Sequence, residues 1–197
     1  SASDVDGDEL TLSAESFSDN VSVNVLGNQL TMTPALNFNG TADISVTVSD
    51  GELTDSEIFE FTVTPVNDAP ILAALSDTLT VEDTPLTITL SAGDVDGDDL
   101  SFTAESGDEN VTVSVTGDQL TMTPALNFNG TADISVTVSD GELTDSEIFE
   151  FTVTPVNDAP ILAEVGADTT DEDTPLTIAL SASDVDGDEL TLSAESF

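Results

Sequence analysis

The sequence repeats itself with a period of 90 residues, and this feature limits the possible folds more than any other. The segment SASDVDGDELTLSAESF at residues 1–17 returns unchanged at residues 181–197, and a variant, SAGDVDGDDLSFTAESG, begins at residue 91. Residues 29–73 are identical to residues 119–163. A repeat of this length is large enough to bury its own core, unlike the shorter repeats of solenoid proteins. We therefore expect a series of nearly identical domains.

The segment PVNDAP marks the boundaries between copies. It occurs at Pro65–Pro70 and at Pro155–Pro160, in each case after a strand-like pattern that its prolines prevent from continuing. Dividing the chain there predicts one complete domain at residues 67–156. Residues 1–66 then form a partial copy without the first two strands, and residues 157–197 form a partial copy with the first three strands only.

The complete copy has the sequence pattern of short β-strands. Apolar and polar residues alternate, β-branched residues are frequent, and turn residues recur about every 8 to 12 positions. The expected strands are 71–81, 86–92, 100–105, 111–115, 119–123, 132–138 and 147–153. Seven strands in a copy of this length predict an all-β fold, a tandem array of immunoglobulin-like or cadherin-like seven-stranded β-sandwiches.

The alternation also predicts which side chains face the core of that sandwich. Gly117-Asp118, between two of the expected strands, indicates a tight hairpin. The predicted core consists of apolar residues spaced two apart: Leu86, Ile88, Leu90, Leu100, Phe102, Val111, Val113, Leu120, Met122, Ile134, Val136, Val138, Phe149, Phe151 and Val153.

The charge of the chain is unbalanced and excludes several classes of partner. The sequence contains 41 Asp and Glu residues and no Lys, Arg or His, which gives a formal net charge of −41. Self-repulsion of this size opposes a compact state unless cations compensate it. Nucleic acids and anionic membrane surfaces are bound mainly through Lys and Arg, so neither is expected as a direct partner. A hydrophobic content of 38% still suffices for folded cores.

The acidic residues collect in loops that the strand order assigns to two ends of the domain. One end holds Asp94, Asp96 and Asp98 of DVDGD together with Asp140 of VSDGE. The opposite end holds Glu82 and Asp83 of VEDTP, Asn127 and Asn129 of NFNG, and Asn157 and Asp158 of PVNDAP. When copies follow one another, the second end of one copy meets the first end of the next.

Calcium is the metal that best suits such a junction. Ca²⁺ takes six to eight oxygen ligands in flexible geometry, Mg²⁺ is less suited to a cage made only of protein groups, and Zn²⁺ favours the His and Cys that this chain lacks. A solvated acidic turn without a metal is the alternative for a single DVDGD loop. An EF-hand is a further alternative, because Asp94, Asp96, Asp98 and Glu105 have the required spacing. We reject it, because Asp99 replaces the required Gly and a strand pattern follows.

Taken together, these motifs resemble the cadherin-like repeats of large bacterial surface adhesins. The corresponding segments are VED at 81–83, DVDG at 94–97, VSDG at 138–141 and PVNDAP at 155–160. The resemblance implies Ca²⁺ between domains, stiff rods, and adhesion at the cell surface or outside the cell. The chain departs from the family pattern at Pro65 and Pro155, which replace the first Asp of the linker motif, and in NFNG, where Asn replaces an acidic residue. We therefore expect fewer ions at each junction than in cadherins.

When the ligand positions of the family are matched to this sequence, the resemblance implies Ca²⁺ ligands at two junctions. Asn67 and Asp68 would act with Asp94, Asp96 and Asp140, while Glu82, Asn157 and Asp158 would act with Asp184 and Asp186. The complete set of predicted ligands is Asp4, Asp6, Asp50, Asn67, Asp68, Glu82, Asp94, Asp96, Asp140, Asn157, Asp158, Asp184 and Asp186.

The favoured function is a repetitive extender segment of a secreted or cell-surface adhesin or of a matrix fibre in a biofilm, stiffened by Ca²⁺. Its partners would be neighbouring repeats of the same or of like chains, without membrane insertion. One alternative is a Ca²⁺-dependent module that binds polysaccharide or a cell-surface ligand, or that adheres homophilically, although Trp and Tyr are absent. Another is a filament, a homopolymer in which the partial copies complete one another between chains. We do not expect an enzyme, because the carboxylates face linkers and not a cleft.

Overall fold

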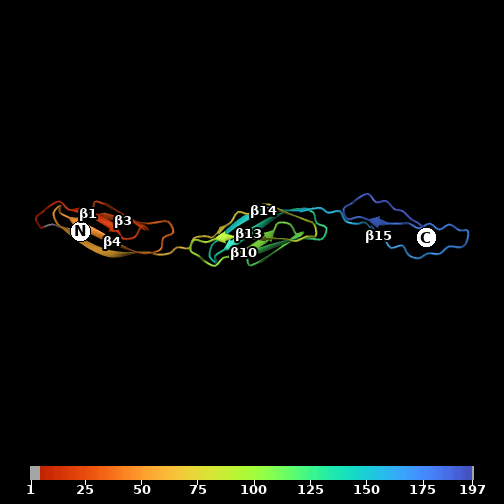
Figure 1. The fold of residues 1–197 in the computed structure, drawn as a ribbon, viewed down its shortest axis with the longest axis horizontal. Coiled ribbons are helices and arrows are strands. Elements are labelled where there is room, and N and C mark those ends of the chain that lie inside the picture. Colours follow the sequence, from red (N-terminus) through yellow and green to blue (C-terminus); the bar gives the residue numbers. More distant parts are fainter. Residues whose placement is uncertain (1–4, 197) are drawn as a thin grey trace. The chain divides into compact units, whose positions relative to one another are not determined.

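The computed structural model describes residues 5–196 and divides the chain into two compact units, Ser1–Asp68 and Ala69–Phe197. Every regular element in the described residues is a β-strand, which confirms the predicted all-β class (Figure 1). The first unit ends at residue 68 where we predicted 66, and residues 157–197 fall in the same unit as the complete copy, so the predicted domain ends at 66 and 156 stay predictions.

The complete copy is built from two sheets that share one core. The first sheet has the order β10-β13-β14-β7, in which only the β14–β7 pair is parallel. The second sheet has the order β11-β12-β8, and a short antiparallel pair joins β6 to β9. The strands are β6 (Ile71–Leu72), β7 (Thr78–Val81), β8 (Leu86–Thr89), β9 (Ala92–Gly93), β10 (Ser101–Ser106), β11 (Val111–Thr116), β12 (Gln119–Pro124), β13 (Gly130–Ser139) and β14 (Thr144–Thr154).

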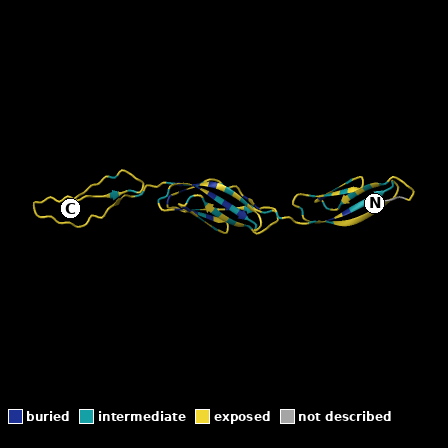
Figure 2. Cartoon of the chain, turned by 180° about the vertical axis from the view of Figure 1, so that it is seen from behind, coloured by how far each residue is buried: buried dark blue, intermediate teal, exposed yellow. Residues whose placement is uncertain are grey.

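The core of this sandwich agrees with the prediction. Each predicted core residue is either buried in one hydrophobic cluster or packed against it, and the cluster draws on both sheets. Figure 2 shows the buried positions on the strands of the complete copy. Leu72 and Ala132 are also buried, although we did not predict them. The hairpin between β11 and β12 turns at Gly117, whose φ of 61° suits a residue without a side chain.

Two expected strands are each divided in two. The segment 71–81 forms β6 and β7, and the segment 86–92 forms β8 and β9. At the end of β6 and between β6 and β7, backbone amides donate hydrogen bonds to side-chain carboxylates and not to a neighbouring strand. The amide of Leu72 donates to Oδ2 of Asp145 at 2.8 Å, and the amide of Leu75 donates to Oε2 of Glu147 at 2.7 Å. This exchange lets the chain cross from one sheet to the other.

The first unit has the later strands of the same domain. Its sheet has the order β1-β4-β5, and a separate hairpin joins β2 to β3. Among the described residues of this unit there is no counterpart of β7 or β8. Only Val21, Ala42 and Ile44 form its buried cluster. The strands are β1 (Thr11–Ser16), β2 (Val21–Leu26), β3 (Gln29–Pro34), β4 (Gly40–Ser49) and β5 (Thr54–Val63).

Residues 157–196 contain two short strands, β15 (Ile161–Leu162) and β16 (Ala182–Ser183), which pair with each other. We expected three strands in this segment, but the structure assigns none at residues 168–171 and 176–179, the equivalents of β7 and β8, and none near residues 190–195, where the third was expected. The reason lies in the sheet order of the complete copy, where the equivalent strand β10 pairs with β13 alone. The segment 157–197 has no equivalent of β13, so this strand has no neighbour to form a ladder with.

Candidate metal centre

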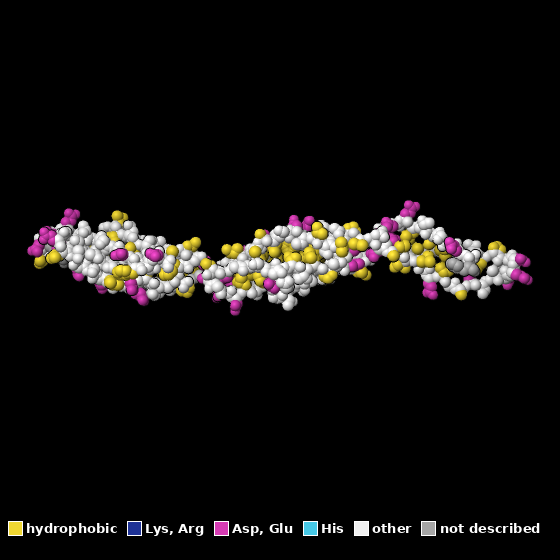
Figure 3. Space-filling model, in the orientation of Figure 1, with side chains coloured by type: hydrophobic (Ala, Val, Ile, Leu, Met, Phe, Trp, Pro, Cys, Tyr) yellow, Lys and Arg dark blue, Asp and Glu magenta, His cyan; other side chains and the backbone are white. Residues whose placement is uncertain are grey.

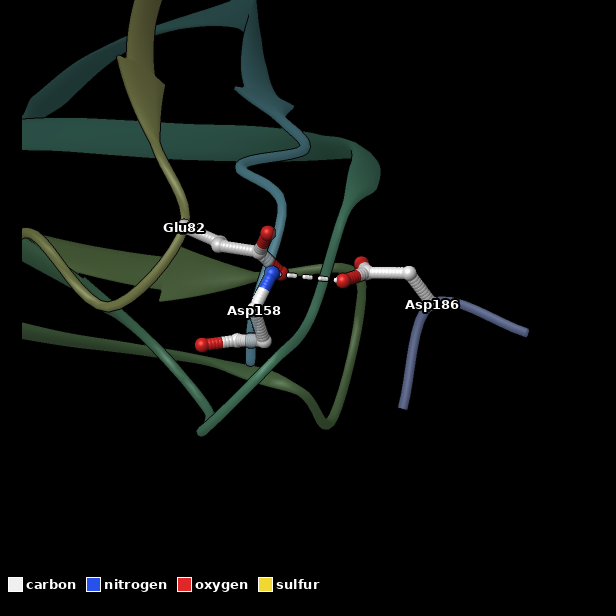
Figure 4. Close-up of side chains that lie close together, drawn as sticks. All are labelled: Glu82, Asp158 and Asp186. Atoms are coloured by element: carbon white, nitrogen blue, oxygen red, sulfur yellow. Dashed lines mark hydrogen bonds between the residues drawn. The ribbon is translucent and has the colours of Figure 1, made fainter. Parts of the chain in front are cut away.

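Three carboxylates from three separate segments meet after the end of the complete copy (Figure 4). Glu82 follows β7, Asp158 lies in the linker that leaves β14, and Asp186 belongs to the DVDGD loop of the next copy. One oxygen from each carboxylate lies within 4.8 Å of the other two. Figure 4 shows the carboxylates of Glu82 and Asp186 directed toward each other on either side of the Asp158 amide. We call these residues the junction cluster.

Backbone amides hold the junction cluster in place. The amide of Asp158 donates to Oδ2 of Asp186 at 2.7 Å, and the amide of Val156 donates to Oε1 of Glu82. The Glu82 amide in turn donates to the carbonyl oxygen of Thr154 at 2.9 Å, so the residue is tied to the end of β14 from both sides. Glu82 is only 4% exposed. A buried carboxylate is costly without a positive partner, and this chain has no basic side chain to supply one.

The electrostatics of the cluster favour a cation. Desolvation raises the pKa of Asp158, and the negative charges of Asp186, Glu82, Asp83 and Asp184 raise it further. A raised pKa means that the negative form of the carboxyl is disfavoured in the fold, so its ionisation as pH rises opposes this arrangement. A divalent cation at the same place would remove that penalty, because it attracts each of the carboxylates.

A second cluster lies in the DVDGD loop at the opposite end of the complete copy. Asp94, Asp96 and Asp98 each place a carboxylate oxygen within 4.8 Å of the others. Oδ1 of Asp94 accepts the amides of Asp96 at 2.8 Å and Gly97 at 3.0 Å, and the φ of 82° at Gly97 makes this tight turn possible. Oδ2 of Asp94 is buried and has no hydrogen-bond partner within the described residues. An orphaned carboxylate oxygen of this kind suits a cation.

The loop between β13 and β14 faces the DVDGD loop, as the strand order predicted. Desolvation raises the pKa of Asp98, with further contributions from Asp94, Asp96, Asp140 and Glu142. Oδ1 of Asp140 accepts the amides of Glu142 at 2.7 Å and Leu143 at 2.6 Å, which fixes this loop.

Asp50, the equivalent of Asp140 in the first unit, makes the same turn. Its Oδ1 accepts the amides of Glu52 at 2.8 Å and Leu53 at 2.6 Å. The hydrogen bonds from Leu53 and Glu52 lower the pKa of Asp50, which keeps this carboxylate negative. The acidic loop is therefore shaped locally, in the same way in both copies.

Other polar residues of the predicted ligand loops have structural roles near the junction cluster. Oδ1 of Asp83 accepts the amide of Asn127 at 2.8 Å, so the loop after β7 is tied to the NFNG loop. Oδ1 of Asp184 accepts the amide of Asp186 at 3.0 Å and so shapes the loop that carries a cluster carboxylate. Nδ2 of Asn157 donates to the carbonyl oxygen of Asp158 at 3.1 Å.

The structure thus brings together part of the predicted ligand set. Glu82, Asp158 and Asp186 meet in one cluster, and Asp94 and Asp96 meet in the other. Asp4 lies outside the described residues, and Asp6 is exposed in the loop of the first unit. Asn67 and Asp68 belong to the first unit and their expected partners to the second, so that junction stays a prediction.

Asp98 belongs to the second cluster, but we did not include it among the predicted ligands. The sequence did contain a signal for Asp98, because this residue is the third of the alternating Asp residues in DVDGD.

The donors fit calcium better than other metals. Both clusters consist of carboxylates, which offer only oxygen atoms, the ligands that Ca²⁺ prefers. The residues after the DVDGD loop form β10 and not a helix, which agrees with our rejection of an EF-hand. We therefore regard the junction cluster, with its buried Glu82, as the stronger candidate site.

The family comparisons agree with the resemblance seen in the sequence. Residues 67–152 match the model of the bacterial Ig domain, and residues 1–64 match that of the cadherin-like domain. These matches confirm the prediction of cadherin-like β-sandwich repeats. Both kinds of domain are non-enzymatic and typical of extracellular or surface proteins, and cadherin-like domains usually bind Ca²⁺. No curated protein matches the chain.

Solved structures with a similar fold include cadherin ectodomains. Human protocadherin-24 EC1-2 is 14% identical over 77% of this chain and 84% of that one, with a TM-score of 0.50, which supports the fold. Drosophila N-cadherin EC1-4 is 16% identical over 89% of this chain and 51% of that one, with a TM-score of 0.41. An endo-fucoidan hydrolase of glycoside hydrolase family 107 is 24% identical over 77% of this chain, with a TM-score of 0.39. This chain spans only 24% of the hydrolase.

Residues 5–196 include no helix with the length and apolar character that a bilayer crossing requires.

Proposed function

We propose that these tandem cadherin-like domains form an extender segment of a cell-surface or secreted adhesin, in which Ca²⁺ at the linkers stiffens the array. The junction cluster carries this proposal. It would draw ligands from the loop after β7 of one copy (Glu82), the linker (Asp158) and the DVDGD loop of the next copy (Asp186). Binding one ion to all three would restrict the bending of the linker between the copies.

The expected strength of binding suits a site outside the cell. Extracellular calcium modules bind with a Kd of roughly 10⁻⁴ to 10⁻³ M, so millimolar calcium would fill a large part of such sites. An ion that binds only the folded form adds up to about 1.4 kcal/mol to stability at a tenfold excess over Kd. The ion would also offset the repulsion that raises the pKa of Asp158. In a long array, each linker would be stiffened by its own ion. This property would suit a surface stalk or a biofilm matrix fibre.

Calcium titration of the whole chain, compared with the Glu82→Gln variant, tests the proposal. Gln retains an oxygen that can accept the Val156 amide, so the variant removes the charge without removing that hydrogen bond. We expect Glu82→Gln to weaken the tightest calcium site by about tenfold or more, because ligand charge sets affinity at such sites. The matched control is Glu105→Gln, which removes the same charge from an exposed position on β10 and should leave that site unchanged.

Two results would contradict the proposal. One is an equal loss of affinity in both variants, which would indicate a diffuse cation atmosphere around an acidic protein and not a site. The other is a set of small-angle scattering profiles that superimpose in calcium and in EDTA, because a stiffened linker must change the distribution of distances within the chain.

A further inference from the structure

We propose that the first and last strands of the complete copy form a clamp against tension, in which the carboxylates of Asp77, Asp145 and Glu147 hold the two strands together. We call these three residues the clamp carboxylates. The tension is a pull along the chain, which enters the complete copy before β6 and leaves it after β14. The inference goes beyond the extender function proposed above, because it concerns the domain and not the linker and requires no metal ion.

The direction of the two strands decides how such a pull acts. The chain enters the complete copy through β6 and β7 and leaves it through β14, and β7 and β14 are parallel neighbours. A pull on the start of one parallel strand and on the end of its neighbour slides the two strands past each other. Because the hydrogen bonds of a parallel pair are evenly spaced, they share this pull and do not open one after another.

The main-chain part of the clamp is short. β7 pairs with β14 over residues 78–81 only, and Val81 is opposite Thr154 at the end of the ladder. The hydroxyl of Thr154 donates to the carbonyl oxygen of Thr80 at 3.1 Å, and the amide of Glu82 donates to the carbonyl oxygen of Thr154 at 2.9 Å. The end of the contact is therefore well bonded, and the question is what holds residues 72–77.

Two clamp carboxylates on β14 hold the beginning of the first strand. Asp145 accepts the amide of Leu72 at 2.8 Å, and Glu147 accepts the amide of Leu75 at 2.7 Å. The side chain of Leu72 is buried in the core, and that of Leu75 packs against it. Hydrogen bonds to a charged acceptor are stronger than those between neutral groups. Each bridge therefore joins a strong bond to a backbone that is already anchored.

The third clamp carboxylate forms a bridge in the opposite sense. The amide of Glu150, on β14, donates to Oδ1 of Asp77 at 2.9 Å. The partners of the three bridges are 73, 72 and 73 positions apart, and Phe151 lies opposite Thr78 at the same offset of 73. A constant offset means that residues 72–82 follow β14 in one parallel register. The clamp carboxylates thus continue the contact where the main-chain ladder is absent.

The composition of the chain explains why carboxylates have this role. The sequence has no Lys, Arg or His, and Figure 3 shows acidic side chains on the visible face with no basic side chain beside them. Asp145 and Glu147 are partly buried, and a carboxylate that loses water needs a hydrogen-bond donor. Backbone amides of the first strand supply it. Without Cys, the chain cannot join these strands by a disulfide.

Two of the three clamp carboxylates recur with the repeat. Asp55 and Glu57 occupy the positions of Asp145 and Glu147 in the preceding copy. In the copy that follows, Ala167 replaces Asp77. The bridges from β14 are therefore the constant part of the clamp and the better place to test it.

Single-molecule force spectroscopy of the full chain, held at its two ends, tests the proposal. Unfolding of the complete copy is recognised by its length, because the release of residues 72–156 adds at most about 300 Å. Glu147→Ala removes the acceptor of the Leu75 amide. We expect this variant to unfold about tenfold faster at a fixed force, because unfolding under force follows the unfolding barrier and a hydrogen bond to a charged group has about this weight.

Two further variants serve as controls. Glu147→Gln keeps a side-chain oxygen that can accept the same amide, so it should recover much of the resistance. Asp108→Ala removes two hydrogen bonds, from the amide of Asn110 at 2.8 Å and from its Nδ2 at 2.9 Å, in a loop outside the clamp. Its unfolding rate under force should stay within about twofold of that of the unaltered chain, as for other surface substitutions.

Two results would overturn the clamp. One is an equal acceleration in Glu147→Ala and Asp108→Ala, which would indicate a general loss of stability. The other requires only the unaltered chain. It is an early lengthening by at most about 40 Å at low force, because this step would show that residues 72–82 peel away before the domain unfolds.

The experiment separates this inference from the calcium proposal when it is performed in EDTA and again in calcium. The measured quantity is the ratio of unfolding rates between each variant and the unaltered chain in the same solution. A failure of the junction cluster to bind calcium would leave this ratio unchanged, because the clamp carboxylates do not belong to that cluster.

Discussion

Residues 29–66 of the first unit and residues 119–156 of the complete copy have the same sequence in different surroundings. Ile44 and Ile134 are both fully buried, but Phe59 is 38% exposed where Phe149 is 3% exposed. In each copy the isoleucine and the phenylalanine are directly opposite each other on one strand pair. The complete copy also has β7 beside β14 and β8 beside β12, and the described part of the first unit has no counterpart of either. The difference shows that burial at these positions depends on strands distant in sequence, while the local strand pattern is the same.

The hairpins themselves do not differ between the copies. β4 pairs with β5 from Gly40 opposite Val63, and β13 pairs with β14 from Gly130 opposite Val153, which is the same register. This part of the domain therefore has the same register whether or not the first strands are beside it in the described residues. The comparison predicts that substitutions within a hairpin act equally in both copies and that substitutions at the covered face do not.

The two copies can be followed separately by fluorescence, because the chain has no Trp or Tyr. Ile58→Trp reports on the first unit and Ile148→Trp on the complete copy. Both positions are exposed, so the reporters should disturb the fold little. Denaturant titration of these two variants then gives the free energy of unfolding of each copy separately.

The largest difference is expected for the phenylalanine pair. Phe149→Ala should destabilise the complete copy by about 3–5 kcal/mol, the usual cost of removing a buried aromatic ring. Phe59→Ala should cost the first unit about 1–2 kcal/mol, because its ring is already partly in water. Equal losses in the two copies would show that the face of the first unit is covered in solution.

A smaller difference is expected for the glutamates that face the first strand. Glu147→Ala leaves the amide of Leu75 without its acceptor and should cost the complete copy about 1–3 kcal/mol. Glu57→Ala should change the first unit by less than about 0.5 kcal/mol, as for other surface substitutions. A loss in the first unit as large as in the complete copy would refute the idea that this carboxylate acts through a neighbouring strand.

The smallest difference is expected for the hairpin glycines. Gly27 and Gly117 both have a φ of 61° at the same turn. Replacing either with Ala should cost about 1–2 kcal/mol, because a left-handed conformation is unfavourable for a residue with a Cβ. The two costs should agree within the error of the titration, and a clear inequality would mean that the turn depends on the rest of the sandwich.

The sequence predicted the strands and the core well because both depend on local alternation. Val136 and Val138, for example, are buried as expected from their spacing on one strand. The division of the first strand was not predictable in this way. It depends on carboxylates of Asp145 and Glu147 that bind amides more than 70 positions earlier in the chain. No local pattern near Leu72 contains that information.

The candidate metal site was predictable in part for a similar reason. The motifs located Glu82, Asp158 and Asp186 in loops that the strand order brings to one junction, and the structure places them together. The burial of Glu82 was not visible in the sequence, because it arises from its bonds to the end of β14. The extra acid Asp98 joins its cluster through the tight turn at Gly97.

The central claim is that the junction cluster binds calcium, and crystals grown in millimolar calcium test it most directly through anomalous scattering. We predict a peak bounded by oxygens of Glu82, Asp158 and Asp186 at about 2.3–2.6 Å, the range for Ca²⁺ ligands. A map with well-ordered carboxylates and no anomalous peak between them at that concentration would contradict the claim.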